Sequence, residues 1–195
     1  MTVSRTLNRE KVIKAATKIA HNRGLPALTM SSLARALNVR TQSLYHYVSN
    51  WEELIALVGA YVLKNMRQHI VETVVGLSGK QALVTASECV RMDIKQETFM
   101  SNVFYIIQKA PAGNEVHDEL NKLMMVIQRI IDADAQLKDT LDAEMFIGGV
   151  FGLLIVEFLP DNNVFERRSE EERQLRYHKM VLRLISPSPE ELTNK

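Results

Sequence analysis

Residues 28–54 constrain the fold more than any other stretch, because they predict two short helices joined by a tight turn. Thr29 stands where a side-chain oxygen can accept a hydrogen bond from an orphan N–H of the first helical turn. Asn38 tolerates the left-handed backbone conformation that ends a helix. We therefore expect the first helix over 30–37 and the second over about 41–47.

The two helices are expected to pack through apolar inner faces, with Ala34 small enough to allow a close crossing. The outer face of the second helix carries side chains that can bond base edges and phosphates. A polar outer face over an apolar inner face is the helix-turn-helix design. The sequence thus predicts these DNA-binding residues: Thr29, Arg40, Thr41, Gln42, Ser43, Tyr45, His46 and Tyr47.

This part of the sequence resembles the tetracycline-repressor (TetR) family of regulators. The matching positions are Gly24, Leu28-Thr29-Met30, Leu33-Ala34, Leu37-Asn38-Val39, Ser43-Leu44-Tyr45-His46-Tyr47-Val48 and Glu53-Leu54. The resemblance covers roughly the first quarter of the chain. The family usually has Gly where Asn38 stands, a small capping residue at Arg40, and a phosphate-contacting Lys at Trp51.

The charge is unevenly spread along the chain. Residues 1–50 carry eight Lys or Arg side chains against one acid, a formal charge of +7. The rest of the chain carries 16 basic and 22 acidic residues, a formal charge of −6. A basic head on an acidic body is typical of proteins that bind a polyanion, although a basic helix face can also be merely solvated.

The whole chain is predicted to be all-α, because no segment shows sustained alternation or a hairpin turn. We expect about nine helices in two domains: a helix-turn-helix DNA-binding domain over 1–49, and a ligand-binding and dimerisation domain over 50–195. Besides the two short helices, helices are predicted over 8–23, 50–75, 80–95, 98–109, 114–132, 139–159 and 169–185.

Residues 145–156 form an uncharged run that is apolar all round, which predicts a helix buried on every side. Glycines in such a helix suggest close backbone approach. In TetR-like proteins the last two long helices pair with their copies in a second subunit, so the resemblance implies a homodimer. The predicted interface residues are Gly148, Gly149, Gly152, Val181 and Ile185.

The body of the chain is rich in methionine and aromatic residues. Met is adaptable and often lines permissive pockets, although each position taken singly is more often core. The resemblance implies an effector site in the body, for a small and mostly apolar molecule that the sequence does not identify. The predicted pocket residues are Met66, Met100, Phe104, Met124, Met125 and Phe151.

The sequence offers no sign of catalysis, a cofactor or a metal site. The five histidines are scattered, without the i, i+4 spacing of a metal site. Cys89 is the only cysteine, which fits a reducing cytosol. No apolar run approaches the length that spans a bilayer, and the N-terminus lacks the pattern of a signal peptide. We expect a cytoplasmic protein that does not enter the membrane.

These observations favour a ligand-responsive transcription regulator that is not an enzyme, most readily a homodimeric repressor released from a palindromic DNA operator by a small molecule. Two alternatives stay open: a constitutive DNA-binding protein without an effector, and a helical small-molecule binding protein or enzyme. The charge of +7 on residues 1–50 counts against the second alternative.

Overall fold

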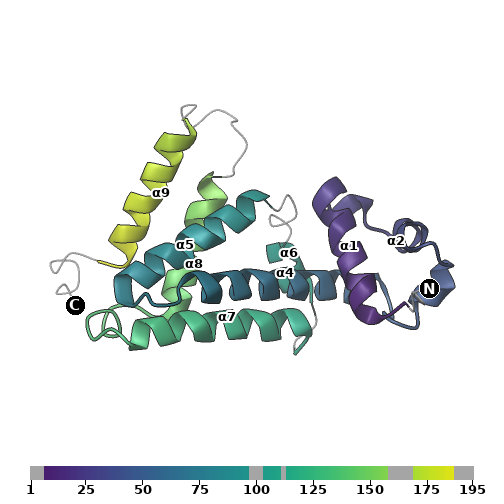
Figure 1. The fold of residues 1–195 in the computed structure, drawn as a ribbon, viewed down its shortest axis with the longest axis horizontal. Coiled ribbons are helices and arrows are strands. Elements are labelled where there is room, and N and C mark those ends of the chain that lie inside the picture. The colour runs from purple at the N-terminus through teal and green to yellow at the C-terminus, as the bar shows by residue number, and fades with distance from the viewer. Residues whose placement is uncertain (1–6, 97–102, 111–112, 158–168, 187–195) are drawn as a thin grey trace, which may run out of the picture. The chain divides into compact units, whose positions relative to one another are not determined.

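The computed structural model describes residues 7–96, 103–110, 113–157 and 169–186. Within these ranges the chain forms only helices and turns, so the predicted all-α class is confirmed. The elements in order are α1 (Arg9–Arg23), the short 3₁₀ helix η1 (Leu25–Ala27), α2 (Met30–Leu37), α3 (Thr41–Leu44), α4 (Trp51–Thr73), α5 (Gly79–Gln96), α6 (Val103–Lys109), α7 (Glu115–Asp132), α8 (Ala143–Glu157) and α9 (Glu170–Leu184) (Figure 1).

The chain divides into two compact units. The first comprises Met1–Met66 with Asp93–Asn121, and the second comprises Arg67–Met92 with Lys122–Lys195. The boundary predicted between residues 49 and 50 divides the chain by function, into a DNA-binding and an effector-binding domain. That boundary stays a prediction.

Local capping bonds set the helix ends in the first unit. Asn8 accepts a hydrogen bond from the Lys11 backbone N–H at 2.8 Å and starts α1. Thr29 and Ser32 form a reciprocal capping box at the start of α2. Asn38 ends α2 in the left-handed conformation, with φ of 54°, as its amide side chain led us to expect.

α3 is shorter than predicted. The helix covers Thr41–Leu44, and residues 45–47 form a turn in which the Tyr47 N–H donates to the Leu44 carbonyl at 2.8 Å. This bond spans three residues rather than the four of an α-helix. The last predicted DNA-binding residues therefore lie on a tightened turn that continues the helix.

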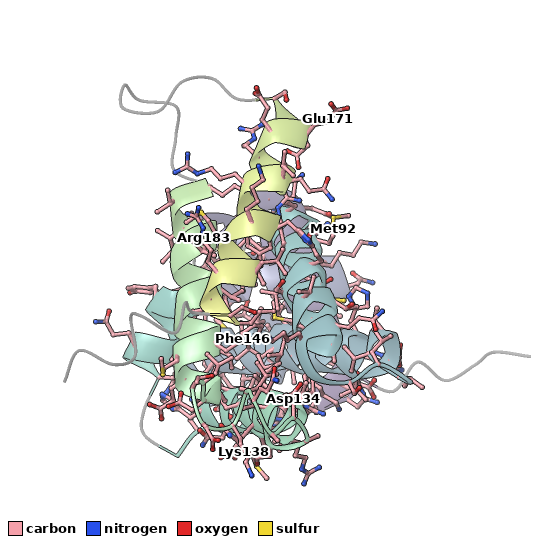
Figure 2. All side chains as sticks on the ribbon, turned by 90° about the vertical axis from the view of Figure 1, so that its left-hand side faces the viewer. Met92, Asp134, Lys138, Phe146, Glu171 and Arg183 are labelled. Atoms are coloured by element: carbon pink, nitrogen blue, oxygen red, sulfur yellow. The ribbon has the colours of Figure 1, made fainter. Side chains whose placement is uncertain are left out.

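α8 and α9 lie side by side in the second unit (Figure 2). The predicted start of α8 near residue 139 is wrong, because the helix begins at Ala143, where Asp142 accepts a hydrogen bond from the Met145 N–H at 2.8 Å. The prediction that this helix is buried on every side is also wrong for the subunit. One face is buried and the other exposes Met145, Gly148, Gly152, Ile155 and Val156.

α9 presents a narrow buried stripe made by Tyr177, Val181 and Ile185. Leu175 and Leu182 lie off this stripe and are exposed, by 55% and 41%. A stripe at intervals of four residues is the face that α9 turns toward its own subunit.

Candidate nucleic-acid interface

The inner faces of α2 and α3 pack as the sequence predicted. Leu33 and Ala34 of α2 are buried, as are Leu44 of α3 and Val48 just beyond it. α2 and α3 are in direct contact, so the two short helices form one packed support. That support fixes which residues of the second helix can face outward.

Four of the predicted DNA-binding residues have exposed side chains: Arg40, Gln42, Tyr45 and His46. Tyr45 is 53% exposed, which is unusual for a side chain of its size in a packed head. Arg40 occupies the N-cap position of α3 without making a side-chain capping bond. These side chains form an outward donor-rich surface, which we call the α3 face.

The other predicted residues are partly engaged in holding the head together. Thr41, Ser43 and Tyr47 are half-buried, while Thr29 is exposed but caps α2. The Tyr47 hydroxyl donates to the carbonyl of Leu7 at 2.9 Å. Tyr47 is among the predicted DNA-binding residues, but its hydroxyl is bonded within the protein.

Trp51 makes a second bond of the same kind. Its indole N–H donates to the Leu28 carbonyl at 3.1 Å. Leu28 comes directly before Thr29, which caps α2, and Leu7 comes directly before Asn8, which caps α1. Tyr47 and Trp51 therefore fix the starts of the two helices that precede the α3 face, a role that sequence analysis missed because both contacts join distant residues.

The junction between the α3 face and α4 is held by Glu53. Its Oε2 accepts a hydrogen bond from the Ser49 N–H at 2.6 Å, and its own N–H donates to Asn50 Oδ1 at 2.7 Å. The bond from the Ser49 backbone is the main reason that the pKa of Glu53 lies below its ordinary value. Asn50 followed three positions later by Glu53 is a recognised helix-start pattern. The bond between the Glu53 N–H and Asn50 could therefore have been predicted from the sequence.

Arg9 of α1 links the same carboxylate to α7. Its guanidinium lies 3.2 Å from Glu53 Oε1 and 2.9 Å from Glu115 Oε1. All three side chains are partly exposed, and ion pairs of this kind contribute ~1 kcal/mol or less. These ion pairs orient the side chains of Arg9, Glu53 and Glu115.

The remaining basic side chains of the head are also exposed. Besides Arg40 they are Lys11, Lys14, Lys18, Arg23 and Arg35. Lys14 lies 2.7 Å from Glu10, the only acid in residues 1–50. Exposed cations around a donor-rich surface provide phosphate contacts, which position a protein on DNA, while the donor-rich surface reads bases. Arg5 lies outside the described residues.

The predicted pocket residues differ in environment. Met66, in the first unit, is 2% exposed, and Phe151, in the second unit, is 9% exposed. Met124 is half-buried, whereas Met125 is 55% exposed on α7. Met100 and the side chain of Phe104 lie outside the described residues. The assignment of these residues to an effector pocket stays a prediction.

The predicted interface residues fall into two groups. Gly148 and Gly152 are on the exposed face of α8. Val181 and Ile185 are buried by their own subunit, and a Cβ at Gly149 would lie 2.6 Å from Leu184 Cδ2 of α9. The close approach expected at Gly149 is therefore a contact between α8 and α9 of one chain. Gly149, Val181 and Ile185 all face the interior of their own subunit.

The described ranges contain neither a candidate metal site nor a candidate membrane span. His, Cys, Asp and Glu side chains there do not gather in any group of three suited to a metal ion. None of the helices described has the length and apolar character needed to cross a bilayer.

The comparisons with known proteins agree with this geometry. The family model of bacterial regulatory proteins, tetR family, matches residues 12–58, which contain most of α1, the capped helix α2 and the α3 face. No curated protein matches the chain.

Solved structures with the same fold cover nearly the whole chain. BioQ with its natural double-stranded DNA operator is 22% identical, covers 97% of this chain and 100% of its own, and has a TM-score of 0.61. FadR from Bacillus subtilis in complex with stearoyl-CoA is 14% identical, covers 92% and 98%, and has a TM-score of 0.67. Apo ActR from Streptomyces coelicolor is 17% identical, covers 95% and 98%, and has a TM-score of 0.61.

Proposed function

We propose that this chain, a member of the TetR family by its N-terminal segment, is a cytoplasmic, homodimeric transcription repressor that leaves a palindromic operator when a small, mostly apolar effector binds. Each subunit would place the α3 face in the major groove of one half-site. Two-fold symmetry of the protein then accounts for the symmetry of the operator.

The observation that carries the proposal is the α3 face itself. Arg40, Gln42, Tyr45 and His46 are exposed on a support whose inner side is packed. Gln suits adenine and Arg suits guanine, because each can make two hydrogen bonds to a base edge. A head with a charge of +7 supplies the attraction to phosphate that such a reading surface needs. BioQ, of the same fold, is known with its DNA operator.

The homodimer is supported by an uncovered surface on α8 and α9. α8 exposes Met145, Ile155 and Val156 beside two glycines, and exposed apolar faces of this kind mark protein interfaces. On α9 a solvent-accessible face carries Glu172, Leu175, Arg176, Lys179, Met180 and Arg183.

The charges along α9 favour a second copy of the chain as the occupant. The first turn carries Glu170, Glu171 and Glu172, and the second half carries Lys179 and Arg183. Figure 2 labels Glu171 at one end of the helix and Arg183 nearer the other. In a two-fold pair with antiparallel α9 helices, the acidic end of each copy meets the basic end of its partner.

The proposed effector is a small, mostly apolar molecule. Met66 and Phe151 are buried, and Met side chains adapt readily to an apolar guest. FadR, which shares the fold, is known in complex with stearoyl-CoA. The effector would act by favouring a spacing of the two heads that does not fit the operator.

A selection of bound duplexes from random DNA tests the proposal directly. We expect a palindromic motif, bound with an affinity that falls steeply with salt, because each neutralised phosphate contributes a slope of ~0.9 in log–log form. A metabolite panel added to the selected complex should then identify a releasing effector. Failure to bind any duplex, or binding that is insensitive to salt, would refute the DNA-binding role.

The antiparallel pairing has its own test. Arg183→Glu should weaken the dimer measured by sedimentation, and adding Glu171→Arg in the same chain should restore it. Lys80→Glu, an exposed charge reversal on α5, serves as the control. If the double variant is no better than Arg183→Glu, the two ends of α9 do not meet.

A further inference from the structure

Arg91 of α5 is a buried cation that the proposed function does not use. Its side chain is 1% exposed. The guanidinium Nε lies 3.1 Å from both carboxylate oxygens of Glu157, and Nη2 lies 2.6 Å from Glu157 Oε1 and 2.7 Å from Glu170 Oε1. One side chain therefore holds two carboxylates that come from different helices.

The two carboxylates mark special positions in the chain. Glu157 is the last residue of α8 and Glu170 is the first residue of α9. Arg91 thus fixes the end of one helix and the start of the next, although the connection between them lies outside the described residues. The planar guanidinium is suited to this, because it can donate to two carboxylates from separate edges.

The aromatic ring of Tyr177 strengthens the same site. The Arg91 guanidinium lies 5.6 Å from its centroid, within the range of a cation–π contact. The Tyr177 hydroxyl donates to the Ser87 carbonyl at 2.9 Å, so Tyr177 also ties α9 to α5. Burial would lower the pKa of Arg91, but the bonds to Glu157 and Glu170 prevail and raise it.

The two carboxylates have different surroundings. The Glu157 side chain is 8% exposed, so it depends on Arg91 for compensation of its charge. The Glu170 side chain is 46% exposed and lies 3.6 Å from Arg173 as well. Removing Glu170 should therefore leave the core intact while breaking the link to α9.

That link acts on a part of α9 that its subunit does not bury. None of residues 170–176, all of which the structure describes, is buried, and Tyr177 is the first residue of α9 that is. These residues make up about two helical turns. They also carry the acidic end of α9 that, on the proposed function, pairs with a second copy.

We propose that Arg91 is a positioning residue for assembly: through Glu170 it holds the first two turns of α9 in the orientation that a second copy of the chain recognises. This inference rests on the proposed homodimer. It assigns a role in assembly to a residue whose side chain is hidden inside the subunit. Without the bond between Arg91 and Glu170, α9 binds the second copy less tightly, because the acidic end of α9 must then become ordered as the two copies associate.

Glu170→Ala tests the proposal, with Glu72→Ala on α4 as a control that removes one exposed acid elsewhere in the same unit. Amide hydrogen exchange should quicken over residues 170–176 in Glu170→Ala and stay unchanged over 177–184. The dimer dissociation constant from a sedimentation dilution series should rise about three- to tenfold relative to Glu72→Ala, as expected for one partly exposed charge-assisted hydrogen bond in each subunit.

Arg91→Lys provides a second variant, since a single ammonium cannot reproduce the two-sided contact. It should quicken exchange over the same residues in a protein whose circular dichroism remains helical. Unchanged exchange over 170–176 in Glu170→Ala would overturn the link to α9. Faster exchange with an unchanged dimer constant would overturn the role in assembly, whereas a monomeric wild type would refute the proposed homodimer and, with it, this role.

Discussion

Replacing Gly152 with Leu tests whether the exposed face of α8 is an interface. A Cβ added at Gly152 meets no described atom within 4 Å, and the same holds at Gly148. A Cβ at Gly149 would instead lie 2.6 Å from Leu184 Cδ2. Three glycines in one helix thus differ in what a side chain would meet, and this difference gives the experiment its control.

The magnitudes follow from this geometry. In the isolated subunit the Cβ of Gly152→Leu meets no described atom within 4 Å, and the substitution improves helix propensity by ~0.8 kcal/mol. In a dimer whose α8 helices approach closely, an inserted side chain costs ~1–3 kcal/mol by overpacking. A two-fold interface contains two copies of the change, so the dimer should be weakened by about 2–6 kcal/mol. This corresponds to about a 30-fold to 10⁴-fold rise in its dissociation constant.

Sedimentation over a dilution series measures that constant, and titration of the selected operator follows its consequence. Circular dichroism first establishes that each variant is folded. Gly149→Leu, the control, should instead destabilise the subunit by ~1–3 kcal/mol, because Leu184 of the same chain has to move. An unchanged dimer constant in Gly152→Leu would show that nothing packs on this face of α8.

Three further predictions concern the head. Gln42→Ala should relax base preference at one operator position, worth ~1–3 kcal/mol, while unchanged preference in a repeated selection would remove Gln42 from base reading. Tyr47→Phe loses the bond to the Leu7 carbonyl, so it should lower stability by ~1 kcal/mol and weaken all operators by one factor; a changed motif would contradict a positioning role. The bond from the Ser49 N–H lowers the pKa of Glu53 in the folded state. The contribution of Glu53 to the free energy of unfolding is therefore complete above the ordinary pKa of 4.5 and is lost as the pH falls through the lowered pKa. Glu53→Gln should remove that part of the acid dependence of melting temperature, and an unaltered profile would exclude it.

The features that sequence predicted well are local ones. The caps at Thr29 and Asn38 depend on bonds or backbone angles within a few residues, so residue type alone indicated them. The delayed start of α8 is also local, but two local patterns compete there. The N–H groups of Thr140 and Leu141 donate to the Leu137 carbonyl at 3.0 and 2.9 Å, and Asp142 then caps α8. This turn takes the place of the expected first helical turn.

The features that sequence missed join residues far apart in the chain. Trp51 bonds a carbonyl 23 residues away, and Arg91 bonds carboxylates 66 and 79 residues away. No periodicity signals such contacts, because each depends on how whole helices pack. The buried Arg91 also goes against the expectation that arginine lies at the surface. Its burial is explained by the carboxylates of Glu157 and Glu170, which only the folded structure brings to it.

The exposed face of α8 shows how sequence and structure complement one another. Residues 145–156 contain no charge, so periodicity could not tell which side faces the subunit. The structure separates the buried Phe146, Val150 and Leu154 from the exposed Met145, Ile155 and Val156. A helix selected only for burial in its own subunit would carry polar residues on the exposed side, as α7 does with Asn121, Lys122 and Arg129. The proposed homodimer accounts for the missing polar residues on α8, because a second apolar surface would then cover this face. The acidic and basic ends of α9 favour a partner of complementary charge order.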